Sequence, residues 1–319
     1  MHCELLVPGL LSATTTPRAA ALELLLARGR RTGADAATPE AWLFEGFGAR
    51  QHAAGAFSLL GAGGEPGEAS WARADPVHLR LLRDRVVVMP AEALPLSPEE
   101  AGSLAVHLAA IAEVRVLSPR RWSVRLPGGA VAGAKPAIEA AGEPAPIARD
   151  SDRLLTEIQM SLHAHPVNEA REARGQPPVN SLWLWGGGPL ERLEECPWQS
   201  VLADDPLPLG LARAAGARQM ALPQHAAAWL SRAAEDGRHL IVLDALRAPA
   251  ALSAEDDVRE ALERLERDWF APLLCALRDG RVGMVTIHVP DGEAASSFET
   301  ARGDLRRFWR RPRALERYT

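Results

Sequence analysis

The run LHAHPVNEAREARGQPPVNSLWLWGGGP, residues 162–189, concentrates residue types that often do chemistry in proteins. His163 and His165 are two positions apart, which on a helix corresponds to about 200°. The two imidazoles therefore point to opposite sides, and a shared metal site on one helical face is not predicted. The glycines at 186–188 are followed by Pro189 rather than by the Gly-Lys-Ser/Thr of a phosphate-binding loop, so a nucleotide site is not predicted either.

Polar side chains cluster where this run breaks its helical pattern. Pro166 follows His165 directly, and Asn168 and Arg171 come within the next two turns. A helix break of this kind can turn several donors toward one anion. A surface helix with ion pairs explains the same spacing, and spacing alone favours that simpler interpretation.

A second candidate lies in ADPVHLR, where Asp75, His78 and Arg80 surround a proline that stiffens the turn. Taken alone, this stretch is better interpreted as a charged loop that enters a strand. The basic run RRFWRRPR, residues 306–313, has two interpretations as well. It can bind an acidic partner or a phosphate backbone, or it can lie along its own domain with its charges in water.

Hydrophobic periodicity predicts the elements that must position these residues. The apolar runs CELLV, SLWLW, LIVLD and GMVTIH predict strands of one mainly parallel sheet, because they alternate with amphipathic helices such as residues 256–277. The runs DRVVVM, EVRVL and WSVRL, with a helix capped by Ser97, predict a separate α+β lobe. Trp183 and Trp185 are expected in a strand buried on both faces.

Composition sets the class of protein. The chain has 319 residues, of which 47% are hydrophobic, enough for a sizeable core. Its net charge of −5 predicts neither nucleic acid nor a membrane as partner. Three widely spaced cysteines predict neither a disulfide framework nor a zinc knuckle. Without an apolar run of roughly 18 residues or a basic leader, a cytoplasmic protein is expected.

The segment HPVNEAREARGQPPVNSLWLWGGGP resembles the archaeal-type cofactor-independent phosphoglycerate mutases, whose segment runs His-Pro-Val-Asn, Arg, Gly, Pro-x-Asn and a strand ending Trp-x-Trp-Gly-x-Gly. Over its whole length, including ADPVHLR, LERDWFAPLL and RGDLRRFWRRP, the chain resembles the bacterial RpfE-type regulatory proteins, relatives of those mutases. The resemblance implies an alkaline-phosphatase-like α/β fold, with a mainly parallel sheet and helices on both of its faces. The core is expected from residues 1–74 and 151–319, with an inserted α+β lobe at 75–150.

Departures from the family pattern concern the metal ligands. Active members use two divalent metals held by Asp and His at strand ends. Here Pro8-Gly9 stands in place of the Asp-Gly after the first strand, and only Asp244 and His288 match ligand positions. Two ligands do not hold two ions, since each ion needs several donors. The resemblance with these departures implies a pseudoenzyme without a metal cofactor.

Two functions remain open. The first is a non-catalytic regulatory protein that binds a small phosphorylated or carboxylate ligand and that can also meet a protein partner through its Arg-rich C-terminus. The second is an active phosphoglycerate mutase or phosphatase with a reduced site for manganese or another divalent metal, built from Asp244, His288 and Asp291. In the first function ADPVHLR and HPVNEAR are expected to meet in space and form one ligand cradle. Its predicted residues are Asp75, His78, Arg80, His165, Asn168, Arg171 and Asn180.

Overall fold

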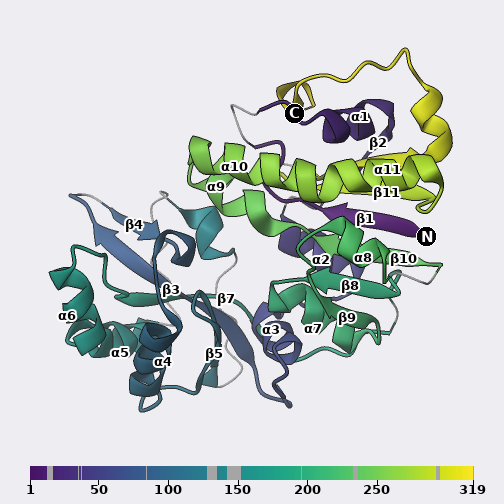
Figure 1. The fold of residues 1–319 in the computed structure, drawn as a ribbon. Coiled ribbons are helices and arrows are strands. Elements are labelled where there is room, and N and C mark those ends of the chain that lie inside the picture. The colour runs from purple at the N-terminus through teal and green to yellow at the C-terminus, as the bar shows by residue number, and fades with distance from the viewer. Residues whose placement is uncertain are drawn as a thin grey trace. The chain divides into compact units, whose positions relative to one another are not determined.

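The computed structural model describes residues 1–12, 17–34, 36, 38–83, 85–127, 135–141, 152–194, 196–232, 236–291 and 295–318 (Figure 1). The chain folds into two compact units. The first contains residues 1–49, 193–204 and 215–319, and the second contains residues 50–192 and 205–214. The predicted lobe, 75–150, lies within the second unit, which also takes in the flanking residues 50–74 and 151–192.

A seven-stranded sheet forms the centre of the first unit. In spatial order its strands are β2 (Arg30–Ala34), β12 (Ala295–Ala301), β11 (Met284–Val289), β1 (His2–Leu6), β10 (Arg238–Val242), β8 (Ser200–Ala203) and β9 (Arg218–Ala221). The five strands from β11 to β9 are parallel, whereas β12 runs antiparallel to both of its neighbours. The predicted class, an α/β fold with a mainly parallel sheet, is confirmed.

Helices cover the sheet of the first unit on both faces, as continuous apolar strands require. Residues Cys3, Leu5 and Val7 of β1 and the turn after it pack into one core with α1 and the α10–α11 rod. The other face meets α2, whose Trp42 packs against His288 of β11 with ring centroids 4.5 Å apart and ring planes at 41°. The helices are α1 (Ala20–Arg28), α2 (Pro39–Gly46), α8 (Ala226–Leu230), α9 (Arg247–Ala251), α10 (Glu255–Leu265) and α11 (Ala271–Asp279).

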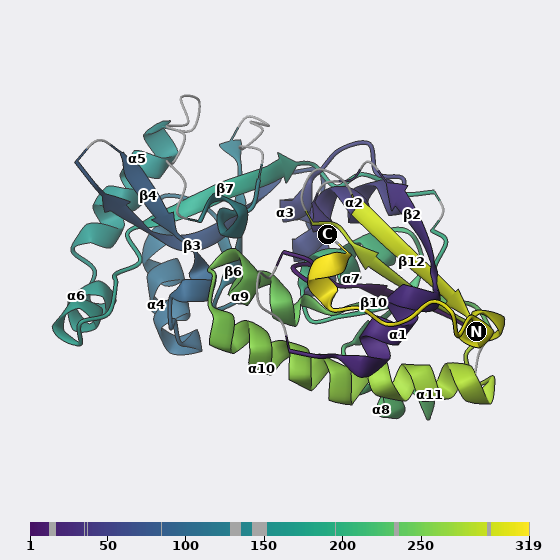
Figure 2. The same cartoon turned by 90° about the horizontal axis from the view of Figure 1, so that it is seen from above.

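The predicted long helix at 256–277 exists as a rod made of α10, a π-helical turn (Glu266–Phe270) and α11, best followed in Figure 2. Acidic residues occupy its first turn, where the helix dipole favours negative charge. The rod ends at Gly280, which has a φ of +79° that a side chain would disfavour. Within the described residues, no helix is long and apolar enough to cross a membrane.

The second unit is built on one long strand, β3 (Trp71–Leu81), and all of its pairings are antiparallel. One edge of β3 pairs with β7 (Ser181–Gly188), and the other pairs first with β6 (Arg121–Arg125) and then with β4 (Val86–Met89). Strand β5 (Val114–Ser118) follows β6. The predicted lobe runs DRVVVM, EVRVL and WSVRL correspond to β4, β5 and β6 of the second unit, apart from residue 84, which lies outside the described residues.

The described helices of this unit are α3 (Ala54–Gly61), α4 (Pro98–Leu108), α5 (Asp152–His163), α6 (Pro166–Ala173) and α7 (Pro206–Ala214). The first three pack on the sheet, whereas α6 packs on α4 and α7 on α3. Ser97 caps α4 in a capping box with Glu100, as its sequence predicts. Helices α3 and α7 touch backbone to backbone. A Cβ atom at Gly210 would lie 1.7 Å from the carbonyl oxygen of Phe57, so only glycine fits there.

The placement of SLWLW is a correction to the sequence prediction. CELLV, LIVLD and GMVTIH are the adjacent strands β1, β10 and β11, but SLWLW is β7 in the second sheet, antiparallel to β3. Leu182 and Leu184 pack into a core with α4 and α5, while Trp183 packs on the opposite side against Val77. A strand covered on both faces has the same continuous apolar pattern in either kind of sheet.

Candidate functional site

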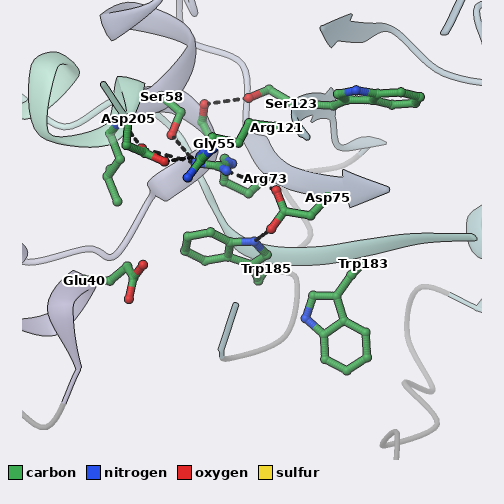
Figure 3. Close-up of polar contacts among 12 residues, drawn as sticks. Glu40, Gly55, Ser58, Arg73, Asp75, Arg121, Ser123, Trp183, Trp185 and Asp205 are labelled. Atoms are coloured by element: carbon green, nitrogen blue, oxygen red, sulfur yellow. Dashed lines mark hydrogen bonds and ion pairs between the residues drawn. The ribbon is translucent and has the colours of Figure 1, made fainter. Parts of the chain in front are cut away.

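Strand β3 carries a buried charged pair where the sequence indicated a loop. Arg73 and Asp75 are 3% and 7% exposed and point to the same face of the strand (Figure 3). Arg73 Nη2 donates to Asp75 Oδ1 at 3.0 Å, and the Trp185 indole N–H donates to Asp75 Oδ2 at 2.6 Å. The guanidinium also lies over the Trp185 ring, 5.2 Å from its centroid. These contacts tie β3 to β7 through charge rather than apolar packing alone.

The same guanidinium reaches two helices. Arg73 Nη1 donates to Ser58 Oγ of α3 at 3.2 Å and lies 3.6 Å from Asp205 Oδ1 at the start of α7. Arg121 of β6 binds the other oxygen of Asp205 (Figure 3). Burial alone would raise the pKa of Asp205, but Arg121 and Arg73 outweigh it and hold the pKa at about 2. We call these six residues the Arg73 cluster: Ser58, Arg73, Asp75, Arg121, Trp185 and Asp205.

Two arginines and two aspartates balance the charge of the Arg73 cluster, and most of its donors have protein partners. Arg73 Nε is the exception, since it is buried without a hydrogen bond among the described residues. Buried charges need such pairing to offset their loss of hydration. Asp75, predicted as a ligand contact, thus contacts Arg73 and Trp185.

Asn168 and Arg171, two further predicted cradle residues, are 2% and 0% exposed. The Asn168 amide donates to the carbonyls of Leu162 and Val179 at 2.8 Å each, and its oxygen accepts from Val179 N at 2.9 Å. Its side chain therefore fixes the segment that leads into β7.

Arg171 holds a second part of the same loop. It donates to the carbonyls of Pro177 and Pro95, both at 3.0 Å, and to Glu100 Oε2 at 2.9 Å. Of the guanidinium nitrogens of Arg171, Nη2 alone is buried without a hydrogen bond to the described residues. The guanidinium thus links α6 to the N-terminus of α4, and three of its donor contacts are made within the protein.

His165 acts as the N-cap of α6. Its Nδ1 accepts from Val167 N at 3.2 Å, and its ring meets His107 edge-on with centroids 4.8 Å apart. An Nδ1 that accepts leaves the proton on Nε2, so the neutral ring has no lone pair left for a metal. Burial, with a smaller contribution from His107, lowers the pKa of His165.

The remaining predicted residues lie where β3 approaches the segment before β7. His78 Nδ1 is 3.0 Å from the Pro178 carbonyl oxygen, and the Asn180 amide bonds both the N–H and the C=O of Leu79 at 2.7 and 2.9 Å. Since Asn168 binds Val179, ADPVHLR and HPVNEAR are joined through residues 177–180. Arg80 is exposed.

The carboxyl edge of the parallel sheet holds two of the three metal-ligand candidates. Asp291, after β11, accepts from Gly9 N and Leu11 N at 2.8 Å each, using both carboxylate oxygens. Burial raises the pKa of Asp291, and the amide hydrogen bonds oppose that rise. Asp244 begins the 3-10 turn after β10.

His288, the third candidate, lies within β11, with Nδ1 2.7 Å from Ser297 Oγ and Nε2 3.4 Å from Glu4 Oε2. No group of three or more His, Cys, Asp or Glu residues in the described ranges is arranged to hold a metal ion. Asp244, His288 and Asp291 as placed therefore do not form such a group, and each oxygen of Asp291 already accepts one amide hydrogen bond.

Glu4 is a buried charge that motif reasoning missed. It lies in the middle of β1, 2% exposed, and accepts from Arg238 Nε at 2.6 Å and from the Trp198 indole at 2.9 Å. Burial alone would raise the pKa of Glu4, but contacts with His288, Arg238 and Trp198 outweigh it and lower the pKa to about 2. A glutamate inside the apolar run HCELL was the signal that could have found it.

Comparison with known proteins yields a likeness of fold. Neither a protein-family model nor a curated protein sequence matches the chain. The solved structure of the PH0037 protein from Pyrococcus horikoshii matches with a TM-score of 0.52 and 13% identity, over 94% of this chain and 87% of that one. A cofactor-independent phosphoglycerate mutase from Thermoplasma acidophilum matches with a TM-score of 0.43 and 17% identity, over 95% and 90%. The first likeness concerns the fold alone, and the second is too distant to support an argument.

Proposed function

We propose that this chain is a phosphoglycerate-mutase-like protein of the RpfE regulatory type, with an alkaline-phosphatase-like fold, which acts without dinuclear metal chemistry. In this proposal it is a non-catalytic protein that binds a small phosphorylated or carboxylate ligand. The alternative is an active mutase or phosphatase with a reduced site for manganese or another divalent ion.

One observation favours the non-catalytic function. Asp291 stands at a strand end, where the resemblance implies metal ligands, but its two oxygens bind the amides of Gly9 and Leu11. One of the two lone pairs on each oxygen is thus engaged, and a cation bound to the other would compete with the amide for the same charge. The carboxylate thus serves the turn after β1, and Pro8 supplies no second carboxylate beside it.

The anion-binding part of the proposal depends on the donors that the fold leaves available. Asn168, Asn180 and most of Arg171 are engaged with backbone groups, whereas Arg80 is exposed beside His78. An exposed guanidinium can bind a phosphate or carboxylate through two parallel N–H bonds. Arg80 is accordingly the residue on which ligand binding is tested.

The proposal predicts no conversion of 3-phosphoglycerate to 2-phosphoglycerate by the purified chain, with or without added manganese. It also predicts that the chain binds 3-phosphoglycerate in isothermal titration calorimetry, and that Arg80→Ala weakens this affinity. The control, Arg83→Ala, removes another exposed arginine of the second unit and should leave the affinity unchanged. Manganese-dependent turnover would establish the alternative. Absence of both turnover and binding would contradict the proposal that this protein binds a small anionic ligand.

A further inference from the structure

An exposed aromatic pair stands out on the first unit. Phe308 and Trp309 are 77% and 66% exposed, although large apolar side chains are usually buried. Their rings meet edge to face, with centroids 5.3 Å apart and planes at 82°. The two side chains therefore form one protruding apolar knob rather than two separate exposed residues.

Positive charge flanks this knob in the sequence. Residues 302–313 contain six arginines and one acidic residue, Asp304, on a chain with a net charge of −5. Asp304 is engaged, since it accepts from Ala301 N at 2.9 Å and pairs with Arg307 at 2.8 Å. Arg30 and Arg31, at the start of β2, are also exposed; Arg30 pairs with Glu299 at 2.5 Å, whereas Arg31 contacts the hydroxyl of Ser296. The charge here is opposite to that of the whole chain.

The segment is anchored to its own unit. Arg307 Nη1 donates to the Arg28 carbonyl at 3.2 Å, and Arg310 Nη1 donates to the Gly29 carbonyl at 2.8 Å. In Figure 1 the yellow C-terminal segment correspondingly lies beside α1 and β2. Two basic runs, 28–31 and 306–313, are thereby brought together from opposite ends of the sequence.

We propose that residues 306–313, with Arg30 and Arg31, form a surface that docks on membranes containing anionic lipid. Tryptophan and phenylalanine partition into the interface of a bilayer, and each nearby arginine adds attraction to anionic headgroups. A bilayer accepts an exposed aromatic pair directly, whereas an apolar peptide ligand needs a groove. This inference concerns a surface other than the proposed ligand site and does not depend on it.

Co-sedimentation of the full chain with vesicles tests the proposal. Binding is expected to vesicles of phosphatidylcholine with phosphatidylglycerol, to weaken with added salt, and to be absent on phosphatidylcholine alone. At about 1 kcal/mol for each arginine, Arg311→Ala/Arg313→Ala should weaken partitioning about thirtyfold. Phe308→Ala/Trp309→Ala should abolish the part of binding that survives high salt.

Matched variants of the second unit serve as controls. Arg83→Ala/Arg192→Ala removes two exposed arginines, and Leu81→Ala/Met160→Ala removes two side chains that are 78% and 73% exposed. Both should sediment like the unaltered chain, and circular dichroism should show all variants folded. Equal loss in the control and patch variants would overturn the proposal. So would tight binding to single-stranded oligonucleotide or poly-glutamate without binding to anionic vesicles.

Discussion

Replacing Asp75 with alanine removes the acceptor that joins strands β3 and β7 in the second unit. Arg73 then loses its 3.0 Å partner, and the Trp185 indole N–H, 2.6 Å away, is left buried without an acceptor. Breaking a buried ion pair costs about 3–5 kcal/mol, and an orphaned buried donor costs about 1–3 kcal/mol. Because both penalties come from one side chain, they overlap, and we expect the free energy of unfolding to fall by about 3–5 kcal/mol.

Urea unfolding followed by far-UV circular dichroism measures this change, provided that the slope against urea stays the same. Trp185→Phe removes the indole N–H and keeps an aromatic ring beside Arg73. The double variant Asp75→Ala/Trp185→Phe should therefore be less destabilised than the sum of the single variants, by about 0.5–3 kcal/mol. That coupling would identify the indole hydrogen bond as part of the cost.

Glu260→Ala is the control, since this glutamate lies in the middle of α10 with an exposed side chain and a surface ion pair, and its loss should change stability by less than about 0.5 kcal/mol. A loss below about 1 kcal/mol for Asp75→Ala would refute the reasoning, because water would then be satisfying Arg73 and Trp185. Additive effects of Asp75→Ala and Trp185→Phe would contradict the hydrogen bond between Trp185 and Asp75, but not the ion pair between Asp75 and Arg73.

Three further changes should have distinct outcomes. The folded pKa of Glu4, about 2, lies below its ordinary 4.5, so its stabilisation is complete above pH 4.5 and is lost as the pH falls toward 2; Glu4→Gln should flatten acid unfolding in that window. Arg171→Ala should lower the free energy of unfolding in urea by about 3–5 kcal/mol, because Glu100 and the carbonyls that Arg171 binds lose a buried partner. A variant as stable as the unaltered chain would contradict this structural role of Arg171. Gly210→Ala should prevent close contact with Phe57 and lower the melting temperature, whereas Gly102→Ala, with open space around it, should not.

The strands of the first unit could be predicted because their surroundings match their pattern. β1, β10 and β11 are largely buried on both faces, and helices lie between them in the sequence, which fits a parallel sheet. SLWLW has the same pattern for another reason, since α4 and α5 cover one face of β7 and the Val77 cluster covers the other. A continuous apolar pattern indicates that a strand is buried on both faces, but it does not indicate which strands pair with it.

The polar residues chosen from the sequence are informative, but their partners could not be read there. Asn168, Arg171 and Asn180 have the donor sets that an anion needs, and a loop of backbone carbonyls and amides needs the same donors. The prolines at 177 and 178 cannot donate, and Arg171 and His78 contact their carbonyl oxygens. Whether a donor binds a ligand or the backbone depends on the path of the chain, which spacing does not encode.

The turn after β1 is held to the end of β11 by hydrogen bonds. Gly9 has a φ of +82°, and a Cβ there would lie 2.7 Å from the Leu246 carbonyl oxygen, so this turn requires glycine. Asp291 then crosses from the end of β11 and bonds the Gly9 and Leu11 amides. In a metal site, carboxylates are brought together because an ion offsets their repulsion. Here a single carboxylate meets two amides, and neighbouring β1 and β11 are joined by hydrogen bonds that need no ion.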